Sequence, residues 1–279
     1  MAQLIDGKQI SKEIKDELKT EVQKLKSEEK NVCLAVVQVG DDPASTVYVN
    51  NKKKACAYIG IESRSYELPE STSEEELTAL VEELNEDDGV NGILVQLPLP
   101  SHIDEDRIIR TISPDKDVDG FHPVSVGRLW IGEKGFLSCT PAGIIQLLKR
   151  SNIEIAGKNC VIIGRSNIVG KPMAALLLRE NGTVTITHSK TKDLQKITKT
   201  ADILIVAIGK ERFITSDYVK EGAVVIDVGM HRDSENHLCG DVDFKDVEPK
   251  VSAITPVPGG VGPMTIAMLM NNCVETVRC

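Results

Sequence analysis

Hydrophobic residues recur along the chain with two different periods. Ile10, Ile14, Leu18, Val22 and Leu25 are four and three residues apart, so they predict the buried face of an amphipathic helix. Short apolar runs follow, and they carry no helical period. The first of them, CLAVVQVG at 33–40, predicts a buried strand that ends at glycine.

The same alternation continues through the rest of the chain. Pro43 predicts the first turn of a helix that extends to about Gly60, and Ser73 with Glu76 forms a capping-box pattern before a further helix. The remaining elements are strands at 63–68, 92–100, 159–164, 183–188, 203–209 and 223–229, helices at 104–112, 140–150, 169–179 and 191–199, a short helix before 223, and a final helix at 262–277.

This order of elements predicts an α/β fold built from βαβ units with parallel strands. We expect a domain boundary near Cys139 and Thr140, after the glycine-rich stretch 127–135. The final helix follows a Pro/Gly turn, and we expect it to pack back on the first domain.

Composition narrows the classes of function. The 279 residues carry a net charge of -9 and only nine aromatic rings, which argues against a nucleic-acid partner. Seven scattered cysteines without a CxxC pair predict reduced thiols and no zinc site. No apolar run reaches the ~20 residues of a membrane span, so we expect no membrane partner. The cytoplasm is the expected location, with an organelle matrix left open.

A glycine turn between a strand and a helix is the best candidate for nucleotide binding. Gly164, Arg165, Ser166 and Gly170 lie where backbone N–H groups and a helix N-terminus would face a pyrophosphate. An ordinary βα connection is the alternative. The following strand ends in Ser189 with no carboxylate for a ribose 2′-hydroxyl. Arg165 with Ser189 therefore favours NADP over NAD.

Tyr48 and Lys52 are four residues apart on a predicted helix and share one face. Lys53 and Lys54 are adjacent cations, and like charge and partial burial both favour a neutral amine that can act as a general base or acid. A solvated basic helix face is the alternative.

Gln96 is an amide inside the apolar run 92–100, so it needs a hydrogen-bond partner. Its place near the end of a strand favours orientation of a reacting group, and a purely structural role is equally open.

The loop with Asp115, Asp117 and Asp119 resembles a calcium loop only in part, because Val126 stands where the motif needs glutamate. We expect one of these carboxylates to bind an amidine-like NH–C–NH₂ edge instead. A rigid glycine-rich turn at 255–265 could approach a ligand closely, or could serve as a domain hinge.

Together these motifs resemble the methylenetetrahydrofolate dehydrogenase/methenyltetrahydrofolate cyclohydrolase family over the whole chain. The resemblance rests on five motifs: YVxxK at 48–52, GILVQLPLP at 92–100, PxKDVDGF at 114–121, GRSxxVGxP at 164–172 and ITPVPGGVGPMT at 254–265.

The resemblance implies two domains: an α/β folate-binding domain at 1–139 with the helix 265–279, and a Rossmann-like, doubly wound parallel-sheet NADP domain at 140–264. It also implies a cleft between them that holds the active site. The homodimer that it implies forms through the NADP domains. No metal is implied.

The resemblance also implies the roles of individual residues. Lys52 would transfer protons, Gln96 would orient Lys52, Tyr48 would pack on the folate, and Asp119 would hold the pterin. Further substrate residues would be Leu97, Pro258, Gly259 and Gly260, and the cofactor residues would be Gly164, Arg165, Ser166, Ser189 and Met230. The implied substrates are one-carbon derivatives of tetrahydrofolate. Two rivals remain: an NADP-dependent dehydrogenase without the hydrolytic step, and a nucleotide sensor without turnover.

Overall fold

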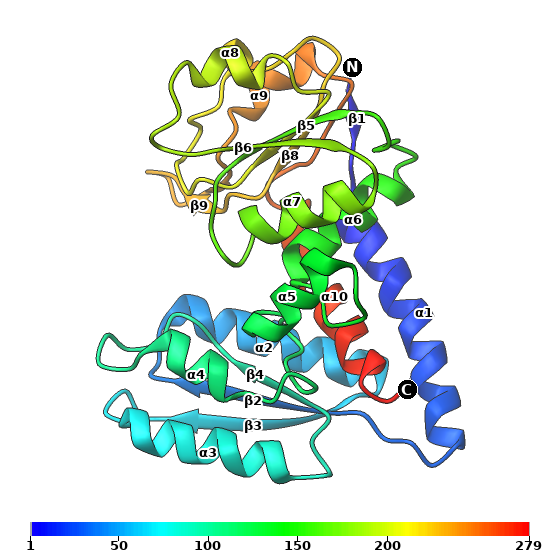
Figure 1. Cartoon of the computed structure of the whole chain (residues 1–279), viewed down its shortest axis with the longest axis vertical. Helices are drawn as coiled ribbons and strands as arrows, with labels where there is room; N and C mark the ends of the chain where they lie inside the picture. Colours follow the sequence, from blue (N-terminus) through cyan, green and yellow to red (C-terminus); the bar gives the residue numbers. More distant parts are fainter. Residues whose placement is uncertain (1, 279) are drawn as a thin grey trace. The chain divides into compact units, whose positions relative to one another are not determined.

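Two separate parallel sheets organise the chain (Figure 1). The structure is a computed structural model that describes residues 2–278, apart from the side chain of Ala44. Unit 1 comprises the residues up to 11 together with 138–265, and unit 2 comprises 12–137 and the residues from 266 onward. No helix within 2–278 is long and apolar enough to cross a membrane.

Unit 1 is built on a six-stranded, all-parallel sheet in the order β1-β11-β8-β7-β5-β6. Its strands are β1 (Gln3–Leu4), β5 (Asn159–Ile163), β6 (Thr183–Thr187), β7 (Ile203–Val206), β8 (Val224–Asp227) and β11 (Ala253–Ile254). The chain leaves β5 first toward β6 and then returns to β7 on the other side of β5. This reversal is the point at which doubly wound sheets bind ligands.

The central strands of unit 1 are apolar on both faces because helices cover both sides of the sheet, and β7 is buried along its whole length. The other elements of this unit are α6 (Cys139–Arg150), α7 (Gly170–Arg179), α8 (Leu194–Thr198), α9 (Phe244–Val247), the 3₁₀ turns Ser216–Tyr218 and Glu248–Lys250, and the hairpin of β9 (His231–Arg232) and β10 (Leu238–Cys239).

Unit 2 contains a three-stranded parallel sheet in the order β3-β2-β4. Its strands are β2 (Cys33–Val39), β3 (Glu62–Leu68) and β4 (Gly92–Val95), and its helices include α2 (Pro43–Ile59), α3 (Glu74–Glu86), α4 (Glu105–Thr111) and α5 (Pro123–Ile131). Two of the three boundaries between the units fall inside α1 (Gly7–Ser27) and α10 (Val261–Glu275), and the third lies between residues 137 and 138, just before α6.

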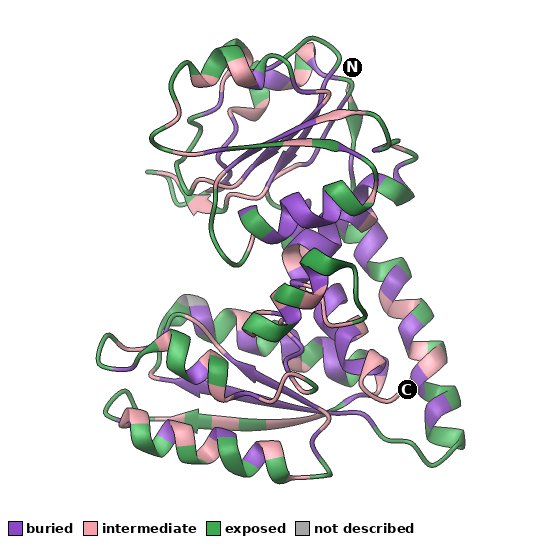
Figure 2. Ribbon diagram, viewed as in Figure 1, coloured by how far each residue is buried: buried purple, intermediate pink, exposed green. Residues whose placement is uncertain are grey.

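The core of unit 2 follows the hydrophobic pattern of its elements. Leu77, Val81 and Leu84 of α3 pack against alternate residues of β2 and against β4. Figure 2 shows β2 and β4 buried, whereas the edge strand β3 alternates between partly buried and exposed residues. The predicted capping box of α3 is confirmed, because Ser73 and Glu76 exchange backbone and side-chain hydrogen bonds.

The parallel α/β fold is confirmed, but two expectations about single elements were wrong in detail. The strand expected at 92–100 ends at Val95, because the chain turns through Pro98, which has no N–H for a sheet ladder. Helix α5 lies in the glycine-rich stretch where we expected none. We predicted that residues 1–139 belong to the folate domain; in the structure β1 pairs with β11, and residues 2–11 group with unit 1 by their contacts.

Candidate active site and cofactor site

Lys52 is a buried cation on α2, with 8% of its surface exposed. The helix begins where the Asp42 carboxylate accepts a hydrogen bond from the Ser45 N–H at 2.7 Å, and it ends at Gly60 with φ 94°. A buried ammonium group needs a polar partner. Lys52 Nζ donates a hydrogen bond to Gln96 Oε1 at 3.0 Å.

The amide of Gln96 is held in one orientation. Its backbone N–H donates to Val37 O at 2.8 Å, and its Nε2 donates to Leu97 O at 2.6 Å. Because the amide nitrogen is engaged by this carbonyl group, the amide oxygen is left to receive Lys52. Gln96 therefore positions the lysine amine at the carboxyl end of β4, where ligands of parallel α/β sheets bind.

Asp119 is the acidic group that faces this lysine. Burial raises the pKa of the Asp119 carboxyl group, and the positive charge of Lys52 acts in the opposite direction. The two side chains come from elements 67 residues apart in sequence, so the fold brings them together. A partly buried carboxylate beside a buried ammonium group can accept hydrogen bonds from a ligand while balancing the charge of Lys52.

The loop that carries Asp119 is organised by Asp117. The buried Asp117 carboxylate accepts hydrogen bonds from Phe121 N at 3.2 Å, His122 N at 2.8 Å and Ser125 Oγ at 2.7 Å. Burial raises the pKa of Asp117 to about 6, although these donors favour the ionised form. The three aspartates therefore do not gather: Asp115 is exposed and lies 3.6 Å from Arg128. Within 2–278, no cluster of His, Cys, Asp and Glu could hold a metal ion.

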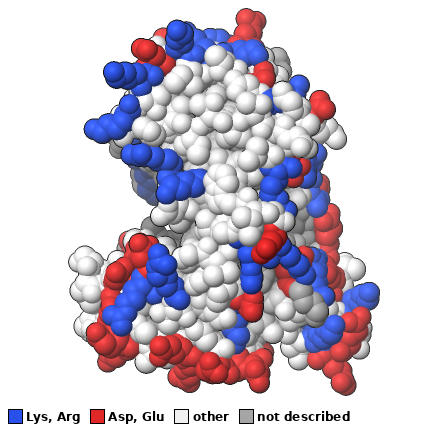
Figure 3. Space-filling model, viewed as in Figure 1, with Lys and Arg blue, Asp and Glu red and all other residues white. Residues whose placement is uncertain are grey.

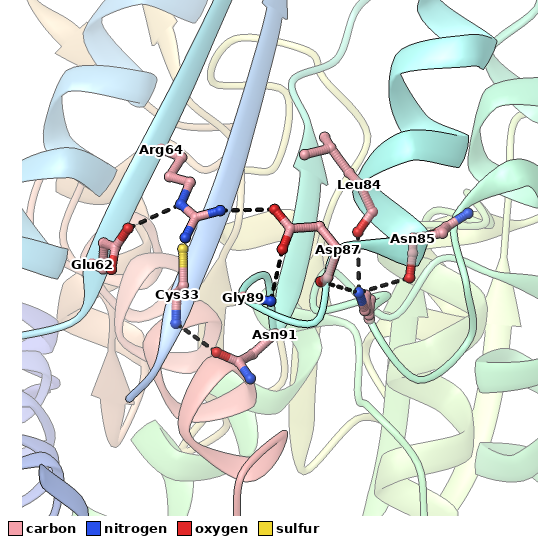
Figure 4. A network of polar contacts seen from close by, with 9 residues as sticks. Cys33, Glu62, Arg64, Leu84, Asn85, Asp87, Gly89 and Asn91 are labelled. Carbon is pink, nitrogen blue, oxygen red and sulfur yellow. Dashed lines mark hydrogen bonds and ion pairs between the residues drawn. The ribbon is translucent and has the colours of Figure 1, made fainter. Parts of the chain in front are cut away.

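Lys116 joins this loop to the end of α3. Its Nζ donates to the carbonyl oxygens of Leu84, Asn85 and Asp87 at 2.7–3.0 Å. Figure 4 shows these carbonyl groups beside an ion pair in which Arg64 lies 2.8 Å from the Asp87 carboxylate. A cation at the last carbonyls of a helix satisfies groups that have no partner inside the helix. Lys116 thus ties the loop to the body of unit 2.

Tyr48 and the other lysines of α2 have different surroundings. Tyr48 is partly buried, and this burial raises the pKa of its hydroxyl group. Lys53 lies 2.7 Å from Glu67, and Lys54 is exposed. We expected Lys53 and Lys54 to act on Lys52 as adjacent cations. Successive helix residues point in different directions, and Lys53 has a carboxylate partner of its own.

The turn after β5 approaches its neighbours too closely for any side chain at its glycines. Gly164 has φ 131°, and a Cβ atom there would lie 2.2 Å from Ala207 O. A Cβ at Gly170 would lie 2.3 Å from Gly164 O. Ser166 Oγ accepts hydrogen bonds from Val169 N at 3.1 Å and Gly170 N at 3.3 Å, which closes the turn onto the start of α7. These contacts explain why the turn needs glycine at both positions, and the assignment of this turn to a pyrophosphate stays a prediction.

The predicted cofactor side chains follow adjacent strands of unit 1. Arg165 and Ser166 come after β5 and Ser189 comes after β6. All three are exposed at the carboxyl edge of neighbouring parallel strands. Met230 follows β8 and is 45% exposed. Around Ser189, His188 Nδ1 accepts a hydrogen bond from Lys190 N at 3.1 Å, so the backbone there forms a defined turn.

The glycine-rich turn at 255–260 is also part of unit 1. Lys8 N donates to Gly259 O at 3.0 Å, and a Cβ at Gly7 would lie 1.8 Å from Gly260 O. Gly259 has φ 109°, a conformation that favours glycine. Close packing against the residues after β1 thus accounts for the glycines of this turn.

Both parts of the chain match models of one family. Residues 5–119 match the tetrahydrofolate dehydrogenase/cyclohydrolase catalytic domain, and residues 138–279 match the NAD(P)-binding domain of the same enzymes. The chain belongs to the tetrahydrofolate dehydrogenase/cyclohydrolase family. The resemblance found in the sequence motifs is confirmed.

Individual relatives of this family are similar over nearly the whole chain. The bifunctional protein FolD of Lachnoclostridium phytofermentans is 75% identical over 274 residues, covering 98% of this chain and 97% of the relative. The crystal structure of the bifunctional FolD methylenetetrahydrofolate dehydrogenase/cyclohydrolase from Campylobacter jejuni has a TM-score of 0.97 at 54% identity, covering 99% and 98%. The Trypanosoma brucei enzyme, solved with NADP cofactor and inhibitor, has a TM-score of 0.94 at 39% identity, covering 99% and 97%.

The structure brings some of the predicted site residues together. Lys52, Gln96 and Asp119 meet at one place in unit 2, with Leu97 holding the amide of Gln96. The residues predicted for the cofactor all belong to unit 1. Pro258, Gly259 and Gly260 were predicted to bind substrate, and they also belong to unit 1.

Sequence reasoning did not predict the supporting role of the side chains that hold these loops in place. They are Lys116 and Asp117 in unit 2, and Asp227 and Asp241 in unit 1. All four occur within or beside the quoted motifs or at strand ends, but their partners are backbone groups distant in sequence. One signal could have identified them: a charged residue at a position expected to be buried, for which we had assigned no contact with a ligand.

Proposed function

We propose that this chain oxidises 5,10-methylenetetrahydrofolate to 5,10-methenyltetrahydrofolate with NADP and then hydrolyses the product to 10-formyltetrahydrofolate. The Lachnoclostridium phytofermentans relative is named as bifunctional, and the Campylobacter jejuni enzyme, which covers 99% of this chain, carries both activities in its name. The observation that carries the proposal is the buried Lys52 amine. It lies 3.0 Å from Gln96 Oε1 and interacts electrostatically with the Asp119 carboxyl group. Such an amine can hold and transfer protons where bulk water is displaced.

In the hydrolytic step, water attacks the methenyl carbon of the cationic substrate. One proton of this water must move to the ring nitrogen that leaves, and the other is released as the neutral formyl product forms. Lys52 Nζ is the group we assign to that transfer. Gln96 fixes where the amine points, and Tyr48, on the same helix face one turn earlier, shapes the surface for the flat pterin and benzoyl rings. The Asp119 carboxylate accepts hydrogen bonds from the pterin NH–C–NH₂ edge.

We assign the dinucleotide to the turn after β5. The glycine cradle at Gly164 and Gly170 fits a pyrophosphate, and Arg165 with Ser189 provides a cation and a hydroxyl for a 2′-phosphate. NADP supplies the hydride acceptor of the first reaction. The chain needs to hold and orient both reactants for this step, since the step requires no proton transfer.

The test is a comparison of Lys52→Met with Lys54→Met, a matched control on the exposed side of α2. We expect Lys52→Met to lower the rate of methenyltetrahydrofolate hydrolysis by about 100-fold or more, with a much smaller loss in NADPH formation. Equal losses in both reactions would refute the assigned role. A parent enzyme that forms NADPH but does not hydrolyse the methenyl compound would establish the dehydrogenase-only alternative, and no turnover at all would establish the sensor.

We also propose that the chain forms a homodimer through unit 1. The edge strand β6 pairs only with β5 among the described residues, and Leu178 and Ile186 beside this edge are 58% and 37% exposed. An unpaired edge with apolar side chains is suited to pairing with a second copy. Ile186→Lys should shift the mass measured by light scattering from dimer to monomer. A cytoplasmic location remains a prediction, which cell fractionation would test.

A further inference from the structure

A buried carboxylate in unit 1 holds the loop that follows β7. Asp241 has no exposed surface, and its two oxygens accept four hydrogen bonds. The donors are Ile208 N at 2.8 Å, Gly209 N at 3.1 Å, Lys210 N at 2.8 Å and His231 Nε2 at 2.7 Å. Three consecutive N–H groups on one carboxylate fix the path of this backbone.

The loop held by Asp241 lies against the glycine turn. β5 and β7 are neighbouring strands, and Ala207 N donates to Ile163 O at 2.8 Å where the two strands end. The Ala207 carbonyl oxygen occupies the space that a Cβ at Gly164 would need. The two loops thus form the two sides of the point where the sheet order reverses.

A second buried carboxylate holds the first one in place. Asp227 ends β8 and accepts hydrogen bonds from Asp241 N and Val242 N, each at 3.0 Å, and from Gly229 N at 2.9 Å. A Cβ at Gly229 would lie 2.4 Å from the Asp241 carboxyl carbon, and a Cβ at Gly240 would lie 1.9 Å from Asp227 Oδ2. The glycines are needed for the two carboxylates to reach their donors.

We propose that Asp241 is a positioning residue for the dinucleotide, acting through the backbone at 207–210. Its four partners are all donors, so an acceptor-only carboxylate fits and an amide does not. An amide at this position would turn an NH₂ group toward at least one N–H group, and the loop would have to move. The inference rests on the proposed placement of NADP at the turn after β5.

The matched pair for testing this inference is Asp241→Asn and Asp243→Asn. Asp243 is two residues away and caps α9 through Asp246 N, a role that asparagine also performs. We expect Asp241→Asn to raise the Kd for NADP roughly 10- to 100-fold, because hydrogen bonds to a buried charge are lost. Asp243→Asn should leave the Kd at the parent value. Hydrolysis of methenyltetrahydrofolate, assayed without NADP, should be unchanged in both variants.

The second readout separates positioning from general damage. If Asp241→Asn lowers the hydrolysis rate as much as it weakens NADP binding, the residue is structural only and the proposal is overturned. His231→Phe removes one of the four donors to Asp241, and it is the test of the positioning role if Asp241→Asn does not fold. It should raise the Kd for NADP about threefold, and an unchanged Kd would overturn the proposal.

Arg165→Ala distinguishes failure of this inference from failure of the proposed placement. If Arg165→Ala weakens NADP binding and Asp241→Asn does not, the cofactor is correctly placed and the positioning role is wrong. If neither variant changes the Kd for NADP, the placement itself is wrong, and the inference falls with it.

Discussion

The two units solve the problem of ligand binding in different ways. Each places its candidate site at the carboxyl edge of a parallel sheet, but unit 1 carries 17 Lys and Arg residues against 15 Asp and Glu, whereas unit 2 carries 16 against 27. On the face shown in Figure 3, acidic side chains gather over the α3 side of unit 2. Lys52 is thus a buried lysine within an acidic unit.

The candidate site of unit 1 is built largely from backbone, with Arg165 as the exposed cation that we assign to the cofactor. Its cradle is formed by glycines whose close contacts leave no space for a Cβ, and its buried carboxylates face backbone N–H groups. Backbone donors at a helix start bind phosphate without a net positive charge. Catalysis by proton transfer needs ionisable side chains, and binding of a pyrophosphate does not. This difference explains why substitutions in the two units should separate the two reactions.

The largest expected effect comes from Gly164→Ala. The new methyl group would lie 2.2 Å from the Ala207 carbonyl oxygen, so one of the two loops must move. We expect NADP binding to weaken by more than about 100-fold, since backbone overlap costs several kcal/mol. Methenyltetrahydrofolate hydrolysis should persist, because its residues lie in unit 2. Gly157→Ala is a control at another glycine with positive φ, 72°, where the space around the added atom is open.

A substitution in unit 2 should give the reverse result. Asp119→Ala removes the carboxylate that we place on the pterin, and we expect the KM for the folate substrate to rise roughly 10- to 100-fold. The Kd for NADP should stay at the parent value. Asp115→Ala changes an exposed aspartate in the same loop and should have no effect on either constant. A parallel loss of NADP affinity in Asp119→Ala would show that Asp119 is misplaced.

These two experiments test residues that motifs could identify in advance. Tyr48, Lys52, Gln96 and Asp119 stand in short, ordered patterns, and local spacing already suggested which of them share a face. That Lys52 and Asp119 lie close together could be predicted only from the resemblance to the family. The two residues come from different elements, and no local pattern links them.

The support for these residues could not be predicted in the same way. Asp117, Asp227 and Asp241 contact N–H groups whose positions depend on the completed sheets. The fold shows the same division. Long periodic helices such as α3 follow from their sequence, whereas β1 and β11 have two residues each and exist only because they pair with each other and with β8. Pairing over such a distance leaves no periodic signal.

The smallest expected effect is on the pH dependence of stability, and it comes from one buried carboxylate in each unit. Burial raises the pKa of Asp117 in unit 2 to about 6 and that of Asp227 in unit 1 to about 7, where the charge of Asp241 adds to the effect. Both values exceed that of an aspartate in the unfolded chain. Between about pH 4 and 7 the folded protein therefore binds more protons than the unfolded chain, and these groups make it less stable as pH rises.

Replacing each of these aspartates with asparagine should show that the two carboxyl groups lose their protons in different pH ranges. The stability of the parent relative to Asp227→Asn should fall as pH rises from 5 and level off above about 7, by on the order of 1 to 3 kcal/mol. The corresponding curve for Asp117→Asn should level off near pH 6. Urea denaturation at constant ionic strength measures both, and taking the difference cancels the contribution of titratable groups that do not contact the substituted residue. A difference curve that rises with pH would mean that hydrogen bonds to the ionised carboxylates outweigh their burial.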